Sequence, residues 1–259
     1  MLRISSRDNA RLKAVERLLT SSRDRRKAGK CVLEGEHLVE AYAQRYGAPE
    51  SIIVADSQLA RPGVKSLVRR FDERTLVVPE AVFRELAVLP AAIGVLAVVV
   101  APVSSQSTGG AFCLVLDDVQ DPGNVGSMLR SAAAAGVSDA FLSPQCVFAW
   151  SPKVLRAGMG AHFHLQIHEN VDLPAWAGRY RSAGGQVAAL VRDGGASLYE
   201  TPLQRPLALA IGNEGAGLSG ALLDAATARV TIPMPGHVES LNAAAAAAVA
   251  LFECVRRLR

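Results

Sequence analysis

Apolar and polar positions alternate in short segments through the first hundred residues. Apolar residues recur at helical spacing between Asn9 and Leu19, which predicts a helix there. Runs rich in β-branched residues predict strands at 31–33, 52–54, 76–78 and 95–100. The segments between them predict helices at 36–46, 62–71 and 79–88. This alternation is typical of an α/β fold with a largely parallel sheet.

A polar stretch then interrupts the pattern. Residues 102–110, PVSSQSTGG, have no periodicity, and they predict a linker at 104–110 between domains at 1–103 and 111–259. Beyond it we expect strands at 112–116, 140–142, 164–168, 187–191, 207–211 and 230–232. Helices are expected at 124–135, 152–158, 173–183, 219–226 and 240–257. The last of these is apolar nearly all round until Arg256, so we expect it to be buried.

Composition restricts the class of protein. The 259 residues are 50% hydrophobic and 20% charged, which allows a large core and excludes a disordered chain. The longest apolar runs, Val95–Pro102 and Ala243–Cys254, are too short to span a bilayer. The start, MLRISSRDNARLK, lacks the apolar stretch of a secretory signal. We therefore expect a cytoplasmic protein without a membrane partner.

Neither cysteines nor histidines indicate a metal site. The four cysteines are widely spaced and form no CxxC pair, so buried thiols are expected rather than disulfides. His162, His164 and His168 alternate and would share one face of a strand. A metal could use that arrangement, but without acidic or cysteine partners nearby, core or surface positions are favoured. We expect no metal.

Positive charge is concentrated at the amino terminus. Residues 1–30 contain ten lysines and arginines but three acids, so they carry +7 within a chain of net charge +4. Such a basic end is the electrostatic footprint of a polyanion binder, whereas the alternative is a solubilising helix face. The scarcity of acids around the SSRDRRK loop favours the polyanion. The cations expected to contact it are Arg7, Lys13, Arg23, Arg25, Arg26 and Lys27.

Three loops that follow predicted strands carry the candidate chemistry. The first, 117–126, contains a Pro-Gly turn before Asn124, a good helix N-cap residue, and the following helix carries Arg130. The second, 212–218, contains three glycines, and the third spans 232–242. Glycine-rich loops at strand ends are where α/β sheets bind ligands. The GxxGxG spacing does not match the dinucleotide fingerprint GxGxxG, and no GxxxxGK[ST] phosphate loop occurs. The residues alone indicate a nucleotide-like ligand site built from three loops.

In this order, the three loops and their flanking elements resemble the motifs of the SpoU/TrmH family of SPOUT RNA 2′-O-ribose methyltransferases. The matching segments are DPGNVGSMLRSAAAAGV, LALAIGNEGAGLS and IPMPGHVESLNAAAAAAVALFE. Residues 151–160 resemble the family's intervening Arg-Ala-Ser-x-Gly segment. The resemblance covers 112–259 strongly, and the amino-terminal part is similar to the family's small substrate-binding domain. Two positions depart from the family pattern: Ala133, where an acid is common, and Gly158, where serine is common.

The resemblance implies a small amino-terminal α/β RNA-binding domain followed by a trefoil-knotted SPOUT α/β domain. It also implies S-adenosylmethionine bound in the knot, and a homodimer with sites at the subunit interface. The family's active-site positions fall on Asn124, Arg130, Glu214, Ser240 and Asn242. The cofactor-binding positions fall on Gly212, Asn213, Gly215, Ile232, Met234 and Leu241.

The implied reaction is attack of a ribose 2′-hydroxyl on a sulfonium methyl. An arginine stays protonated, so for Arg130 a phosphate clamp or alkoxide stabiliser is more economical than the base-like role proposed in the family. The separate amino-terminal domain favours rRNA, with tRNA as the alternative. A non-catalytic RNA-binding protein of the same fold would require loss of Arg130, Asn124 or the glycine loop, and all are present. A small-molecule enzyme with a nucleotide cofactor would leave the basic amino terminus unexplained.

Overall fold

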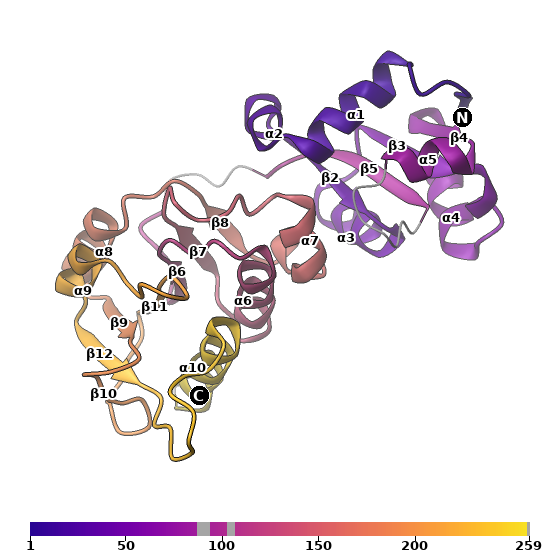
Figure 1. Ribbon diagram of the computed structural model, residues 1–259. Coiled ribbons are helices and arrows are strands. Elements are labelled where there is room, and N and C mark those ends of the chain that lie inside the picture. Colours follow the sequence, from indigo (N-terminus) through magenta and orange to yellow (C-terminus); the bar gives the residue numbers. More distant parts are fainter. Residues whose placement is uncertain (87–93, 103–106, 258–259) are drawn as a thin grey trace. The chain divides into compact units, whose positions relative to one another are not determined.

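The computed structural model describes residues 1–86, 94–102 and 107–257 (Figure 1). The chain forms two compact units: Met1–Pro102 with Trp150–Arg156, and Val103–Ala149 with Ala157–Arg259. Part of the expected linker at 104–110 lies outside the described residues. Within the described ranges, no helix is long and apolar enough to cross a membrane, and no group of histidine, cysteine and acidic side chains is arranged to hold a metal ion.

The first unit is built on a mixed five-stranded sheet with the order β1-β4-β3-β5-β2. Its strands are β1 (Leu2–Arg3), β2 (Lys30–Glu34), β3 (Ser51–Ala55), β4 (Thr75–Val78) and β5 (Val95–Val100). Its helices are α1 (Ala10–Thr20), α2 (Ser22–Ala28), α3 (Glu36–Tyr46), α4 (Pro62–Arg70) and α5 (Glu80–Leu86), with 3₁₀ turns η1 (Asp56–Gln58) and η2 (Asp72–Arg74). β5 runs antiparallel to both β2 and β3, so the expectation of a largely parallel sheet is wrong here. An apolar run buried on both faces reads the same in either direction, and periodicity cannot orient it.

Two helices cover one face of this sheet. Leu12 and Val15 of α1, together with Phe83 of α5, pack on alternate strand residues such as Ile53 and Val98. Helix α3 contacts β2, β5 and α4. One core of the unit therefore lies between α1, α5 and the sheet, and Val39 of α3 and Val64 of α4 are also fully buried.

Helix α2 replaces the loop that we expected around residues 21–27. The side chain of Ser21 accepts a hydrogen bond from Asp24 N and caps the start of the helix. Gly29, at φ 61°, ends it in the left-handed conformation. The helix has seven residues and no apolar periodicity, so only its caps could have revealed it.

The second unit has a seven-stranded sheet in which every pairing is parallel, which confirms the predicted parallel architecture for this half. The strand order is β10-β12-β9-β11-β6-β7-β8. The strands are β6 (Phe112–Leu116), β7 (Asp139–Leu142), β8 (Gln166–His168), β9 (Gln186–Leu190), β10 (Ala196–Ser197), β11 (Leu207–Ile211) and β12 (Ala228–Thr231). The helices that follow β6 in the chain are α6 (Pro122–Ala134), α7 (Pro152–Gly158), α8 (Leu173–Ser182), α9 (Gly220–Ala225) and α10 (Ala243–Arg257), with a 3₁₀ turn η3 (Ala161–Phe163).

Helices also divide between the faces of this second sheet. Trp176 and Tyr180 of α8 and Leu222 of α9 share one core with Val115 of β6 and Ala208 of β11. α10 instead packs against α6 and contacts β11 (Figure 1). The trefoil knot implied by the family resemblance stays a prediction.

The three histidines do not share a strand, contrary to the strand expected at 164–168. His162 lies in η3, is fully buried and has its Nε2 2.9 Å from the carbonyl oxygen of Ala149. His164 is exposed, and only His168 belongs to β8, where it pairs with Asp139 at 3.0 Å. Alternate spacing was misleading because a 3₁₀ turn occupies the first half of the segment. The four cysteines are buried and free, as expected.

Helix α10 is buried on one face only. Ala247, Ala250 and Leu251 are inaccessible, but Val249 and Phe252 are 37% and 49% exposed. The prediction of a helix buried all round is therefore wrong within a single chain. An apolar helix can have several apolar faces, and its composition does not show how many of them are covered by other parts of the same chain. In α10 one face is covered, by α6 and β11.

Candidate cofactor and catalytic site

The three sequence motifs meet at one edge of the second sheet. β6 and β11 are adjacent parallel strands, with Leu116 paired to Ile211, so the loops that leave their carboxyl ends start side by side. The third loop runs from the end of β12 to α10, and α10 packs against α6. Parallel strands thus bring segments about a hundred residues apart to the edge where α/β sheets bind ligands.

Asn124 joins all three motifs through its side-chain amide. Its Nδ2 donates a hydrogen bond to Glu214 Oε1 at 2.8 Å, and its Oδ1 accepts one from Asn242 Nδ2 at 3.0 Å. The Oδ1 of Asn242 in turn accepts from the backbone N–H of Ala244 and of Ala245, which caps the start of α10. Three of the five expected active-site residues therefore form one hydrogen-bonded chain.

Asn124 is not the N-cap that we expected. Helix α6 begins at Pro122, and Asp121 caps it by accepting a hydrogen bond from Asn124 N at 2.8 Å. Proline is favoured in the first turn of a helix, which starts α6 two residues earlier than predicted. The earlier cap leaves the Asn124 side chain available for Glu214 and Asn242.

Arg130 does not belong to the hydrogen-bonded chain that joins Asn124, Glu214 and Asn242. It is exposed on α6, and among the described residues no hydrogen bond or ion pair joins it to Asn124 or Glu214. Ser240, by contrast, lines a pocket beside Glu214. A single chain therefore brings four of the five residues together, and Arg130 is not among the residues that line the pocket.

The glycine loop after β11 is held by its own backbone. Asn213 and Gly217 exchange two backbone hydrogen bonds of 2.9 and 3.0 Å, and Gly217 adopts φ 74°. A Cβ at Gly212 would lie 2.2 Å from the carbonyl carbon of Gly217, so only glycine fits there. Glycine is therefore required at position 212 because the backbone of Gly217 and Leu218 passes so close to it, before any ligand is considered.

The Asn213 side chain also serves the loop. Its Oδ1 accepts hydrogen bonds from Gly215 N and Ala216 N, at 2.9 and 3.0 Å. Its Nδ2 donates to the carbonyl oxygen of Asp118 at 2.9 Å, which ties the second loop to the first. The Asn213 amide is therefore already hydrogen-bonded within the protein, and the groups that the loop can offer a ligand are those of its backbone.

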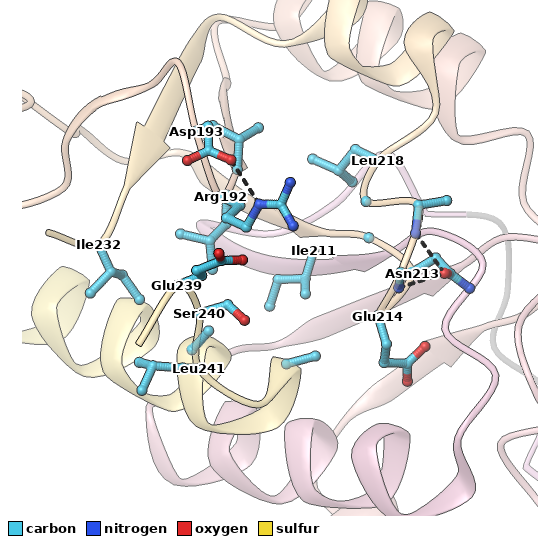
Figure 2. Close-up of a pocket in the computed structure, with 18 of the residues that line it drawn as sticks. Arg192, Asp193, Ile211, Asn213, Glu214, Leu218, Ile232, Glu239, Ser240 and Leu241 are labelled. Atoms are coloured by element: carbon cyan, nitrogen blue, oxygen red, sulfur yellow. Dashed lines mark hydrogen bonds and ion pairs between the residues drawn. The ribbon is translucent and has the colours of Figure 1, made fainter. Parts of the chain in front are cut away.

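A pocket of about 360 Å³ lies between the second motif loop, the third motif loop and the segment at the end of β9. All six expected cofactor positions line it, together with Glu214 and Ser240. Figure 2 shows the labelled side chains around it, with Asn213 and Glu214 on one side and Ser240 and Leu241 on another. The apolar part of the lining comes from Ile211, Leu218, Ile232 and Leu241 among others.

Sequence reasoning missed the part of the pocket that follows β9. Leu190, Arg192 and Asp193 line it, as does Glu239 of the third loop. A strand had been expected at 187–191, and β9 is the neighbour of β11. The rule that ligands bind at carboxyl ends of strands could have included this loop, but its sequence, RDGG, carries no motif of its own.

The charge around the pocket is mostly negative. Three carboxylates, those of Asp193, Glu214 and Glu239, face one guanidinium, that of Arg192. Arg192 Nε donates to Asp193 Oδ2 at 2.7 Å, and this hydrogen bond and charge raise the pKa of Arg192, with a smaller contribution from Glu239. The lining suits a ligand that combines an apolar ring with a positive charge.

The structure accounts for Gly158, one of the departures from the family pattern. A Cβ at this position would lie 2.6 Å from Cε1 and 2.7 Å from Nδ1 of His162. His162 therefore occupies the space that a serine side chain would need. Burial also lowers the pKa of His162 to about 4, so the ring stays neutral at pH 7.

The expected RNA-binding cations have different environments. Arg7 pairs with Glu16 and Glu85 at 2.8 and 3.1 Å, and Lys13 pairs with Asp8 at 2.8 Å. Arg23, Arg26 and Lys27 are exposed on α2.

Arg25 corrects our expectation of a phosphate contact. It is only 6% exposed, and its guanidinium donates to the carbonyl oxygens of Leu18 and Leu19 at 2.6 and 3.1 Å, near the end of α1. Burial lowers the pKa of Arg25. One side of α2 faces α1, so a cation at that position caps a helix instead of meeting solvent.

Comparison with known proteins agrees with both units. Residues 111–252 match the SpoU rRNA Methylase family, and residues 9–97 match the MRM3-like substrate binding domain. The 23S rRNA (guanosine(2553)-2′-O)-methyltransferase RlmP of Bacillus subtilis is 31% identical over 97% of this chain and 98% of its own length. A solved RNA 2′-O ribose methyltransferase superposes with a TM-score of 0.84 at 30% identity, covering 99% of both chains. The SpoU methyltransferase AviRb of Streptomyces viridochromogenes, solved in complex with AdoMet, has a TM-score of 0.85 at 27% identity, covering 96% of this chain and 98% of that one.

Proposed function

The chain belongs to the SpoU rRNA methylase family, and we propose that it transfers a methyl group from S-adenosylmethionine to a ribose 2′-hydroxyl of RNA. The observation that carries this proposal is the pocket lined by the second and third motif loops, to which Asn124 of the first motif is joined through Glu214 and Asn242. The resemblance assigns its residues to the family's cofactor-binding and active-site positions, and AviRb, which shares the fold, was solved with AdoMet.

The pocket fits S-adenosylmethionine by size and chemistry. Its volume of about 360 Å³ lies in the range of small-molecule sites. Ile211, Ile232 and Leu241 offer apolar contacts to the adenine ring, and the backbone of the Gly212–Gly217 loop offers hydrogen-bonding groups. The carboxylates of Glu214 and Glu239 favour the positive charge of a sulfonium. When bound, S-adenosylmethionine supplies an electrophilic methyl group.

The residues around the pocket would orient the ribose hydroxyl. Asn124 holds the Glu214 carboxylate, which can accept a hydrogen bond from a ligand hydroxyl. Ser240 lies at the same pocket and can contact the substrate or the loop backbone. Arg130, always charged, can bind the adjacent phosphate or stabilise the oxygen as negative charge develops on it.

We propose that a second copy of the chain completes the site. Arg130 lies outside the pocket of its own chain, and α10, which packs against α6, leaves Ala245, Val249 and Phe252 exposed along one side. Positions spaced by four and three residues form a continuous stripe on a helix. A homodimer would cover this stripe and bring Arg130 of each subunit toward the site of the other.

The substrate that we propose is rRNA rather than tRNA. RlmP, named for a guanosine of 23S rRNA, matches 97% of this chain, and the chain carries a unit that matches a substrate binding domain. Such a reaction would take place in the cytoplasm, where bacterial rRNA is made.

Methyl transfer from tritiated S-adenosylmethionine to purified rRNA and tRNA tests the proposal. The wild-type chain should label rRNA, and Arg130→Ala should abolish labelling while calorimetry shows nearly unchanged S-adenosylmethionine affinity. A wild-type chain that prefers NAD, or that binds RNA without labelling either class, would overturn the proposal in favour of the dinucleotide enzyme or the non-catalytic scaffold.

A further inference from the structure

The first unit contains a hollow of about 690 Å³ beside α1. Its apolar floor is the outer edge of the core, where Val15 and Leu18 of α1 and Leu76 and Val98 of the sheet are each 3–7% exposed. Its rim carries the cations Arg11, Arg17, Lys27, Lys30 and Arg74. The hollow is thus apolar inside and basic at its edge, and residues of α1, α2 and the sheet line it.

Three of the rim cations differ from Arg7 and Lys13 in having no acidic partner among the described residues. Arg7 and Lys13 are held by acidic partners, as described above. The side chains of Arg11, Arg17 and Lys27 make no hydrogen bond or ion pair with any residue that the structure describes. Positive charge that is not neutralised within the unit therefore faces the hollow.

The acids at the rim do not cancel this charge. Asp24, Glu50 and Glu73 also line the hollow, but Glu50 is held by Lys30 at 2.6 Å. Five cations against three acids leave an excess of positive charge. Phosphate groups are the ligands that such a rim attracts.

The apolar floor indicates that the ligand has an apolar group in addition to phosphate. Val100 lies two residues beyond Val98, on the same face of β5, and is 56% exposed, so it extends the apolar surface. An unstacked nucleobase covers apolar surface, whereas the bases of a duplex are paired and stacked out of reach. The combination fits a single-stranded polynucleotide with one base turned inward.

We propose that this hollow binds a single-stranded segment of the substrate RNA, with one base on the apolar floor and flanking phosphates on Arg11, Arg17 and Lys27. The proposal rests on the proposed function, which makes RNA the substrate. It replaces the buried Arg25 with Arg11 and Arg17, two residues that the sequence did not single out.

Binding of fluorescein-labelled oligouridine to the full-length chain tests the hollow. Arg11→Ala/Arg17→Ala should weaken binding roughly tenfold and make the dependence on salt shallower by about 1.4, since each single-strand phosphate contact contributes about 0.7. Arg45→Ala/Arg69→Ala, which removes two exposed cations from α3 and α4, is the matched control and should bind as the wild type does.

A second variant tests the floor without changing charge. Ala14 is exposed and lines the hollow, so Ala14→Phe should fill it, weakening oligouridine binding severalfold with an unchanged salt dependence. Duplex RNA of the same length should be affected less than oligouridine. Equal oligouridine affinities for the arginine pair, its control and wild type would overturn the proposal, as would an Ala14→Phe chain with wild-type affinity.

Failure of the hollow can be distinguished from failure of the proposed function. If the wild type labels rRNA and these variants bind RNA normally, only the hollow is refuted. If the wild type transfers no methyl group to RNA, the proposed function is refuted whatever the binding results are.

Discussion

The amide of Asn124 donates a 2.8 Å hydrogen bond to the carboxylate of Glu214, a residue 90 positions further along the chain. Its carbonyl oxygen at the same time accepts from Asn242. Only a group with a donor and an acceptor can make both contacts in one orientation. The side-chain amide of residue 124 satisfies both partners, whereas a carboxylate or an apolar side chain would not.

Replacing Asn124 with aspartate should damage catalysis more than cofactor binding. Asn124→Asp places a second carboxylate against Glu214, and we expect turnover to fall at least about 100-fold through the loss of site geometry. Asn242→Asp, which loses one donor but keeps the acceptor that caps α10, should cost less. Methyl transfer at saturating S-adenosylmethionine, with affinity from calorimetry, measures both. Equal turnover of Asn124→Asp and wild type would contradict the assignment.

Gly212→Ala should collapse the cofactor loop. The new Cβ would meet backbone atoms of Gly217 and Leu218 at 2.2–2.3 Å, which we expect to cost about 1–3 kcal/mol of stability and to weaken cofactor affinity roughly tenfold. Gly220→Ala is the control, because its Cβ would meet no atom of a described residue within 4 Å and the residue does not line the pocket. Urea unfolding and calorimetry decide the matter, and similar behaviour of the two variants would argue against the steric explanation.

Arg25→Ala should destabilise the first unit instead of weakening RNA binding specifically. It removes hydrogen bonds to two carbonyl oxygens at the end of α1, a loss of about 1–3 kcal/mol. Arg23→Ala, an exposed change on the same helix, should leave the melting temperature unaltered. If Arg25→Ala melted like wild type but flattened the salt dependence of RNA binding, Arg25 would be a phosphate contact after all.

The buried His162 should make stability fall in mild acid. Its pKa in the folded chain is about 4, below the usual 6.5, so the unfolded state binds the extra proton between these values. The stability that depends on a neutral His162 is fully present above pH 6.5. As the pH falls toward 4, the free energy of unfolding decreases by up to about 3 kcal/mol. Urea unfolding at pH 7.5 and 4.5 should show a smaller difference for His162→Gln than for wild type. His164→Gln, an exposed histidine two residues on, should match wild type.

Phe252→Glu should prevent dimer formation. A charge at the carboxyl-terminal end of the exposed stripe of α10 would be desolvated on association, and we expect the dimer to weaken on the order of 100-fold. Tyr199→Glu, at an exposed aromatic residue outside α10, is the control. Sedimentation would detect the change, and a monodisperse, active wild-type monomer would contradict the dimer.

Much of the second unit follows from local pattern. The strand expected at 207–211 has the observed bounds of β11, because its apolar run ends at a glycine that no side chain can replace. The pocket loops could be placed together because parallel strands share their carboxyl edge. What the sequence could not provide was which donor met which acceptor, such as the link from Asn124 to Asn242.

The errors arose where tertiary contacts decide the outcome. The direction of β5, the burial of Arg25 and the half-exposed α10 all depend on which neighbour covers a residue. The start of α6 is a different case, because its cap, Asp121, is a local signal three residues before Asn124 that apolar periodicity does not detect. Local periodicity contains none of this information.

The loop between Gly212 and Leu218 has a consequence for ligand binding. Its backbone pair between Asn213 and Gly217, and the Asn213 amide, fix its shape without any ligand. Binding therefore does not have to freeze a flexible segment, and little conformational entropy is lost on that side of the pocket. The cofactor meets a preorganised surface, so its affinity should vary little with changes that only stiffen the chain elsewhere.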